Sequence, residues 1–125
     1  MRWTRPLWTS LAAISGVIAV AAGAFAAHGI ADPAAKELLR TGSTYELAHA
    51  LAVLACAALT GAGMPRARLA PAWFLAGSLL FSGSLYALAL GAPRLVGAIT
   101  PFGGLAFLVG WAVLAWAAAT SPREP

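Results

Sequence analysis

The sequence predicts an all-α integral membrane protein folded as a four-helix bundle. Mean hydropathy is +0.82, apolar residues make up 61% of the chain, and charged residues make up only 10%. This composition suits lipid-exposed surfaces rather than a water-exposed globule. Four apolar stretches are each long enough to cross a hydrocarbon layer of about 30 Å, which takes about 20 helical residues. The 125 residues are therefore expected to form one transmembrane domain, residues 1–125.

The expected spans cover residues 7–27, 47–64, 72–90 and 102–119. Turn-forming sequences separate them. Pro71 and Pro101 each stand just before a span, where the first helical turn tolerates proline. In the first connection, Asp32 and Pro33 predict the start of a short helix that ends at Gly42 and lies at headgroup level.

Basic residues predict the orientation. If both termini are cytoplasmic, the inner side holds more Lys and Arg than the outer side, as is usual for membrane proteins. The inner residues are Arg2, Arg5, Arg66, Arg68 and Arg123, and the outer residues are Lys36, Arg40 and Arg94. The tryptophans agree, because all except Trp111 then lie near the inner interface, where amphipathic rings prefer to sit.

The first span has a second interpretation. Its basic start, apolar middle and Ala-x-Ala pattern at residues 24–26 also match a cleaved signal peptide. A retained span is favoured because its apolar part is long for a signal sequence, and because three remaining spans would have less to pack against.

Several functional classes lack support in the sequence. The net charge of +4 comes from basic residues scattered between apolar runs, so no nucleic-acid partner is predicted. Cys56 is the only cysteine and forms no internal disulfide. No phosphate-binding loop, Cys/His metal array or nucleophile motif occurs, and a di-metal site needs more carboxylates than the lone Glu46–His49 pair offers. We predict no catalytic residue, no metal site and no cofactor.

A candidate polar cluster is expected in the outer half of the bundle. It consists of His28, Tyr45, Glu46, His49, Ser82 and Tyr86. Polar residues within membrane spans usually face the bundle interior or a water-filled cavity. His28 ends the first span, and His49 lies about 5 Å inside the second. The two imidazoles are therefore expected at similar depth, where they can meet.

Structural roles compete with functional roles in this cluster. Ser43 and Glu46 match a capping box at the start of the second span, where a negative charge also gains ~0.3 to 1 kcal/mol from the helix dipole. Tyr45 fits an aromatic anchor at the interface. His49 has three interpretations: hydrogen bonding to a neighbouring helix, proton or ligand binding, and metal or haem ligation.

The third span carries a polar face. Ser78, Ser82 and Tyr86 recur at steps of four residues, so they follow one side of the helix. Small residues in the first, third and fourth spans allow close helix packing. The faces formed by these small residues suit a homo-oligomer or a membrane protein partner as readily as contacts within the chain. The lipid bilayer is also a predicted partner.

Four segments carry a family resemblance across nearly the whole chain. They are "GAFAAHGI", "TGSTYELAHALAVL", "LFSGSLYALAL" and "ITPFGGLAFLVGWAVLAWAA". In this order they are similar to a small uncharacterised membrane protein family, a domain of unknown function, that includes transmembrane protein 256 of animal mitochondria and many bacterial inner-membrane members. The resemblance implies four spans in the bacterial inner membrane, a retained first span, and no established activity. Where this chain has Glu46 the family often has Gln, which favours a capping role, because a capping box accepts either residue.

The leading functional prediction is a noncatalytic membrane protein, either an accessory subunit or a small-ligand-binding bundle. One alternative is a transporter or proton-relay component that uses His28 and His49. A second alternative is a haem or metal-binding membrane protein. The expected location is the bacterial plasma (inner) membrane, with several spans and both termini in the cytoplasm.

Overall fold

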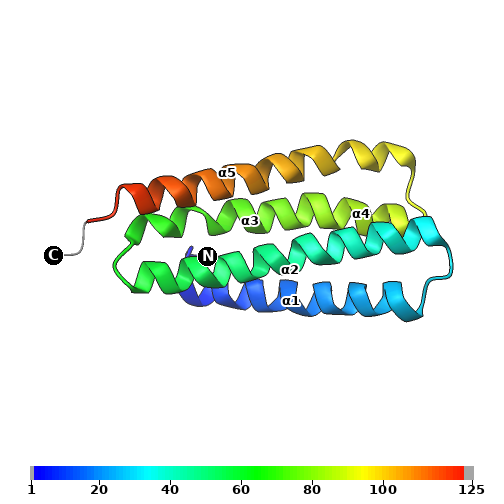
Figure 1. Cartoon of the computed structure of the whole chain (residues 1–125), viewed down its shortest axis with the longest axis horizontal. Coiled ribbons are helices and arrows are strands. Elements are labelled where there is room, and N and C mark those ends of the chain that lie inside the picture. Colours follow the sequence, from blue (N-terminus) through cyan, green and yellow to red (C-terminus); the bar gives the residue numbers. More distant parts are fainter. Residues whose placement is uncertain (1, 123–125) are drawn as a thin grey trace.

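Four long helical segments run alternately up and down the long axis of the molecule (Figure 1). The computed structural model describes residues 2–122, so Arg123, which entered the charge count, lies outside it. The elements are α1 (Arg5–His28), α2 (Pro33–Gly61), η1 (Pro65–Leu69), α3 (Pro71–Gly77), η2 (Ser78–Ser82), α4 (Gly83–Ala89), η3 (Arg94–Ala98) and α5 (Thr100–Ala119). No strand occurs within residues 2–122. All four helical segments are long and apolar enough to cross a membrane, so the predicted fold class is confirmed.

Prolines mark where the helices begin. Pro71 is the first residue of α3 and Pro101 is the second residue of α5, as predicted. Proline suits these positions because the first N–H groups of a helix have no partner within it. The turns after α2 and α4 use Gly63 and Gly91, whose φ angles are +100° and +97°, a backbone region that favours glycine.

The second span is longer than predicted. It begins at Pro33, where the sequence predicted the start of a short helix, and the Asp32 carboxylate caps it by accepting the Ala35 N–H at 2.9 Å. The helix then continues through Gly42 to Gly61, so the prediction of a separate short helix ending at Gly42 is wrong. A break there would leave backbone groups without hydrogen bonds in lipid.

Gly42 is explained by packing rather than by helix termination. It is buried, and a Cβ atom at this position would lie 2.6 Å from the Tyr86 ring. Because glycine has no side chain, the ring of Tyr86 can pack directly against α2 at Gly42.

The predicted capping box at Ser43 and Glu46 is also wrong. Because α2 begins at Pro33, the N–H groups near Ser43 already belong to a continuous helix and need no cap. The Ser43 hydroxyl instead donates to the Ala19 carbonyl oxygen of α1 at 2.6 Å. Ser43, which the sequence predicted as a local cap, thus forms a hydrogen bond between α2 and α1.

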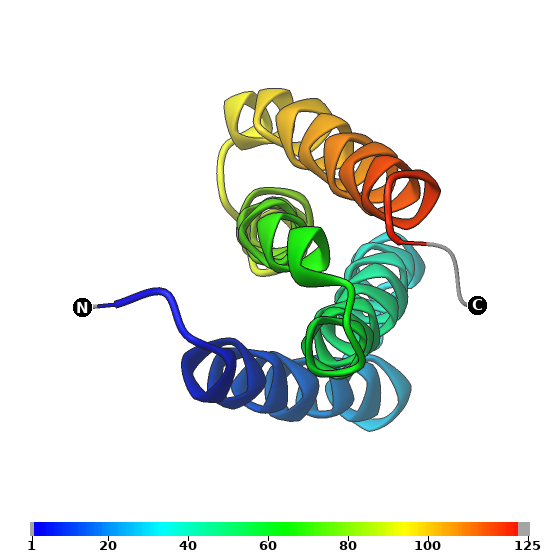
Figure 2. The ribbon, with the colours of Figure 1, turned by 90° about the vertical axis from the view of Figure 1, so that its left-hand side faces the viewer.

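The four segments are not equivalent in packing. An end-on view shows α1 beside α2, with the α3–η2–α4 segment between α2 and α5 (Figure 2). The largest buried cluster lies toward the end that carries both termini and consists of Trp8, Ala12, Ala52, Val53, Cys56, Ala70, Phe74 and Phe107. We call this end the terminal end, and the end with the α1–α2 and α4–η3 connections the far end.

The third segment contains a π-helical turn, η2, near its middle. Beside it α5 approaches very closely, because a Cβ atom at Gly103 would overlap the backbone of Phe81. π-turns often occur near functional positions in helices. This turn lies at the level of the polar groups described next.

Candidate polar site at the middle of the bundle

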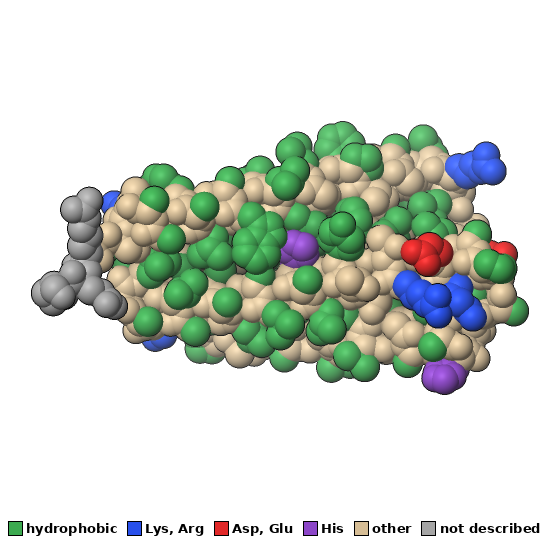
Figure 3. All heavy atoms as spheres, viewed as in Figure 1, with side chains coloured by type: hydrophobic (Ala, Val, Ile, Leu, Met, Phe, Trp, Pro, Cys, Tyr) green, Lys and Arg blue, Asp and Glu red, His purple; other side chains and the backbone are tan. Residues whose placement is uncertain are grey.

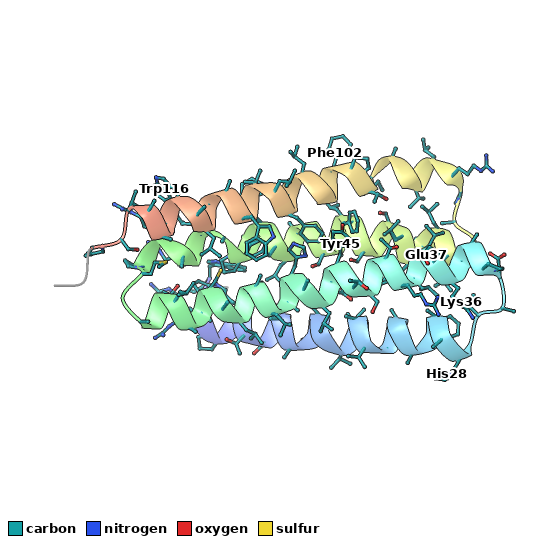
Figure 4. All side chains as sticks on the ribbon, viewed as in Figure 1. His28, Lys36, Glu37, Tyr45, Phe102 and Trp116 are labelled. Atoms are coloured by element: carbon teal, nitrogen blue, oxygen red, sulfur yellow. The ribbon has the colours of Figure 1, made fainter. Side chains whose placement is uncertain are left out.

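The structure separates the two histidines. His28 is exposed at the last residue of α1, at the far end of the bundle (Figure 4). His49 is buried and lies about 24 Å along α2 from Pro33, at a rise of 1.5 Å per residue. The expectation that the imidazoles lie at similar depth and can meet is therefore wrong, because the second span begins at Pro33 rather than near Leu47.

His49 has a partner for each ring nitrogen. Its Nδ1 lies 2.6 Å from the Tyr45 carbonyl oxygen, and its Nε2 lies 3.1 Å from Nε1 of Trp111 on α5. A carbonyl only accepts and an indole N–H only donates. These partners assign the neutral tautomer in which Nδ1 carries the proton and Nε2 accepts from Trp111. Of the three interpretations of His49, this geometry matches hydrogen bonding between helices.

Aromatic rings surround His49 and fill the space between α2 and α5. The Phe107 ring stacks on the imidazole at 3.6 Å between centroids, and Phe74 lies 5.5 Å away. Tyr45 packs on Phe81 at 4.7 Å. Offset and tilted ring pairs of this kind add stability beyond the burial of their area.

Tyr45 lies within a continuous helix rather than at its start. It sits near the middle of the long axis (Figure 4) and is 46% exposed on the outer surface of the bundle. Its predicted place at the start of a span is wrong, because α2 begins at Pro33, and its role as an interfacial anchor stays a prediction.

Glu46 faces a different side of α2. Its side chain is buried, with 6% exposure, and its Oε1 accepts the Tyr86 hydroxyl at 3.1 Å. Ser15 of α1 lies beside the carboxyl group. Within residues 2–122 no Lys, Arg or His side chain forms an ion pair with it. A carboxyl group held only by hydroxyl groups in the interior of a membrane bundle is a candidate functional group.

A groove between α1 and α3 leads to Glu46. Its volume is about 200 Å³. Apolar side chains form most of its walls, and three polar residues lie among them. The lining residues are Leu11, Ile14, Ser15, Ile18, Glu46, Leu75, Ser78 and Leu79. We call this the α1–α3 groove.

The predicted polar face of the third span is divided between two neighbours. Ser82 donates to the Gly42 carbonyl oxygen at 2.7 Å, and Tyr86 reaches Glu46, so both face α2. Ser78 instead lines the α1–α3 groove. Ser84 pairs with Thr100 of α5 at 2.6 Å between hydroxyl oxygens. The third segment thus bonds to helices on both sides.

The polar groups of the groove lie at the middle of the bundle. The four spanning segments are 5–28, 33–61, 65–89 and 94–119. Ser15, Glu46 and Ser78 each lie within about two residues of the midpoint of their own segment. These groups therefore lie near the middle of the long axis of the bundle, and polar side chains within a membrane span are costly unless they are paired.

Two site residues were not singled out from the sequence as members of the cluster. Ser15 carries no motif, and only the groove places it beside Glu46. Trp111 did carry a signal, since it alone among the tryptophans was expected to lie deep in the membrane. Its hydrogen bond to His49 explains that depth.

Metal ligation finds no support in the described residues. No group of three or more His, Cys, Asp or Glu side chains within residues 2–122 is placed to hold a metal ion. Both nitrogens of His49 are already engaged.

The fold and this site define the class: a small integral membrane protein with a polar centre inside a four-span helical bundle. Residues 22–104 match the family described as "Protein of unknown function (DUF423)". The chain belongs to this family, whose bacterial members also carry the name UPF0382 membrane protein. The predicted family of uncharacterised bacterial membrane proteins is thereby confirmed, while the link to animal transmembrane protein 256 stays a prediction.

Three relatives show how far the similarity extends. The UPF0382 membrane protein of Haemophilus influenzae is 46% identical over 112 residues, which cover 87% of this chain and 90% of the relative. The UPF0382 membrane protein of Staphylococcus epidermidis is 38% identical over 107 residues, or 83% of this chain and 88% of the relative. The UPF0382 inner membrane protein YgdD of Escherichia coli K12 is 44% identical over 113 residues, or 82% of each chain. No solved structure matches this chain.

Proposed function

We propose that this chain is a noncatalytic ligand-binding protein of the bacterial inner membrane, which holds a small membrane-dissolved amphiphile in the α1–α3 groove. The observation that carries this proposal is the buried Glu46 carboxyl group, which meets the groove near the centre of the bundle without a basic partner in residues 2–122. A ligand that donates to the carboxyl group would complete its hydrogen bonding.

The lining of the groove supports a particular ligand chemistry. The carboxyl oxygens of Glu46 accept hydrogen bonds, and in the ionised form they also pair with cations, so the ligand proposed for this groove carries an amine or a hydroxyl. The bond from Tyr86, at 3.1 Å, uses one acceptor position of Oε1 and leaves further acceptor capacity on Glu46. Leu11, Leu75 and Leu79 provide apolar walls for a hydrocarbon tail.

The histidine relay has less support than ligand binding. His28 and His49 lie far apart along the bundle axis, and His49 bonds to Tyr45 and Trp111 rather than facing a groove. A role as an accessory subunit, with a homo-oligomer or another membrane protein as partner, stays a prediction.

We also infer that both termini are cytoplasmic. The terminal end carries four arginines among the described residues, and the far end carries three basic residues. The side with more Lys and Arg usually faces the cytoplasm.

Binding is tested with three probes that share one tail: dodecylamine, dodecanol and dodecanoic acid. The full chain is purified in detergent, and native mass spectrometry measures how much of each probe stays bound. We expect the amine and the alcohol to bind and the acid to be excluded by Glu46. Glu46→Gln should weaken amine binding about tenfold, which corresponds to about 1.4 kcal/mol.

Glu37→Gln is the matched control, because Glu37 lies on the same helix but is exposed at the far end (Figure 4). It should leave amine binding unchanged. Equal amine binding by Glu46→Gln and the unaltered chain would contradict the proposal, as would a preference for the acid.

A further inference from the structure

The two ends of the bundle differ in charge. Within residues 2–122, the terminal end carries four arginines and no acidic residue: Arg2, Arg5, Arg66 and Arg68. The far end carries both signs, with Asp32 and Glu37 among Lys36, Arg40 and Arg94. On one face of the molecule, blue and red side chains gather together at the far end (Figure 3). Among the described residues, the terminal end therefore presents positive charge with no acidic side chain beside it.

One of these arginines already has a structural role. Arg66 donates from Nη1 to the Thr120 carbonyl oxygen at 2.9 Å, and its guanidinium lies 5.3 Å from the centre of the Trp116 ring. These two contacts join the start of the third segment to the end of α5. Arg66 is thus held by the protein itself.

Arg5 instead borders an open pocket. The pocket has a volume of about 490 Å³ and is lined by Arg5, Pro6, Thr9, Ser10 and Ala57. The Arg5 guanidinium lies over the end of α2, because a Cβ atom at Gly61 would be 2.6 Å from Nη1. The absence of a side chain at Gly61 lets the guanidinium approach the pocket between α1 and α2.

The other lining residues suit a phosphate group attached to a lipid. Thr9 and Ser10 line the same pocket as Arg5, and because the Ser10 hydroxyl already donates to the Pro6 carbonyl oxygen at 2.8 Å, Thr9 is the hydroxyl donor left for a ligand. Guanidinium binds phosphate through paired N–H groups, and a hydroxyl group adds a further donor. Pro6 and Ala57 are apolar and lie on spanning helices, where the remainder of a lipid molecule would lie.

We propose that the Arg5 pocket binds the phosphate headgroup of an anionic phospholipid. The guanidinium of Arg5 and the hydroxyl of Thr9 hold the phosphate, and the acyl chains follow the surface of α1 and α2 toward the bilayer centre. The unopposed charge of the terminal end selects net-negative lipids over zwitterionic ones, because each basic residue near a membrane surface attracts anionic lipid. This site is separate from the α1–α3 groove and does not depend on Glu46.

The test measures retained lipid on the full chain. Protein reconstituted in nanodiscs of mixed phosphatidylglycerol and phosphatidylcholine is released into detergent, and native mass spectrometry counts the lipids that stay bound. We expect phosphatidylglycerol to be retained in preference to phosphatidylcholine. Arg5→Gln should reduce its retention about fivefold, and Arg5→Lys, which keeps the charge but loses the paired N–H groups, should reduce it less.

Arg94→Gln is the matched control, since it removes one exposed positive charge from the far end. It should leave retention unchanged. Equal losses for Arg5→Gln and Arg94→Gln would overturn the assignment to this pocket. Displacement of phosphatidylglycerol by millimolar inorganic phosphate would also overturn it, because the pocket would then be a site for soluble anions.

Discussion

A histidine near the centre of a membrane bundle is stable here because neither ring nitrogen lacks a partner. Tyr45 lies one helical turn away, whereas Trp111 lies 62 positions away in sequence. The first contact follows from helical spacing, but the second depends on how α5 packs against α2. The sequence therefore identified His49 as a candidate but left its role open, and only the tertiary structure supplied the donor.

The tautomer of His49 can be measured directly. We expect nitrogen-15 NMR in lipid to show a protonated Nδ1 and an unprotonated Nε2. Trp111→Phe should shift the Nε2 resonance and lower the free energy of unfolding by roughly 0.6 kcal/mol, and by no more than ~1.7 kcal/mol, the range for hydrogen bonds between membrane helices. Trp73→Phe, at an exposed tryptophan on α3, is the control. A protonated Nε2 would show that the contact with Trp111 is misassigned.

At the scale of elements, hydropathy located all four spans but misjudged where the second begins. A long run of apolar residues predicts a membrane span from local composition alone. Gly42 and the Ser43–Glu46 pair resemble the end of one helix and the start of another, and both signals are local. Gly42 and Ser43 instead contact other helices: Gly42 packs against the Tyr86 ring, and Ser43 bonds to the Ala19 carbonyl oxygen. These contacts fit a helix that continues through residues 42 and 43. Local patterns carry no information about those contacts.

Neighbouring glycines on α5 test how closely it packs on η2. A Cβ atom at Gly103 would overlap the Phe81 backbone, whereas one at Gly104 would lie 3.8 Å from Phe81 Cδ2, an ordinary contact. Gly103→Ala should therefore lower the free energy of unfolding by about 1–3 kcal/mol, because backbone must move. Gly104→Ala should be neutral or slightly stabilising, since alanine favours a helix.

Unfolding by sodium dodecyl sulfate or by steric trapping measures both glycine variants under the same conditions. Equal effects of the two substitutions would mean that α5 does not pack on η2 through Gly103.

At the scale of the whole molecule, four antiparallel spans place the two ends of the described chain on one side of the membrane. We expect a green fluorescent protein fused after the last residue to fluoresce, and an alkaline phosphatase fused there to be inactive, because both report a cytoplasmic terminus. The opposite pair of results would reverse the proposed orientation while leaving the fold intact.

We infer that α2 crosses the membrane as one unbroken helix, which brings Glu46 and His49 near the centre of the bilayer. Nitroxide labels at exposed α2 positions, in a Cys56→Ser background, report depth through their collisions with oxygen and with a water-soluble nickel complex. Suitable positions are Glu37, Thr44, Leu47, Leu51, Ala55 and Ala58.

We expect depth to rise steadily from Glu37, to be greatest near Leu47, and to fall again toward Ala58, because Leu47 is the midpoint of Pro33–Gly61. A shallow plateau from Glu37 to Thr44, followed by a maximum near Ala55, would instead describe a surface helix joined to a shorter span. That profile would contradict the account, since Glu46 and His49 would then lie near the membrane surface.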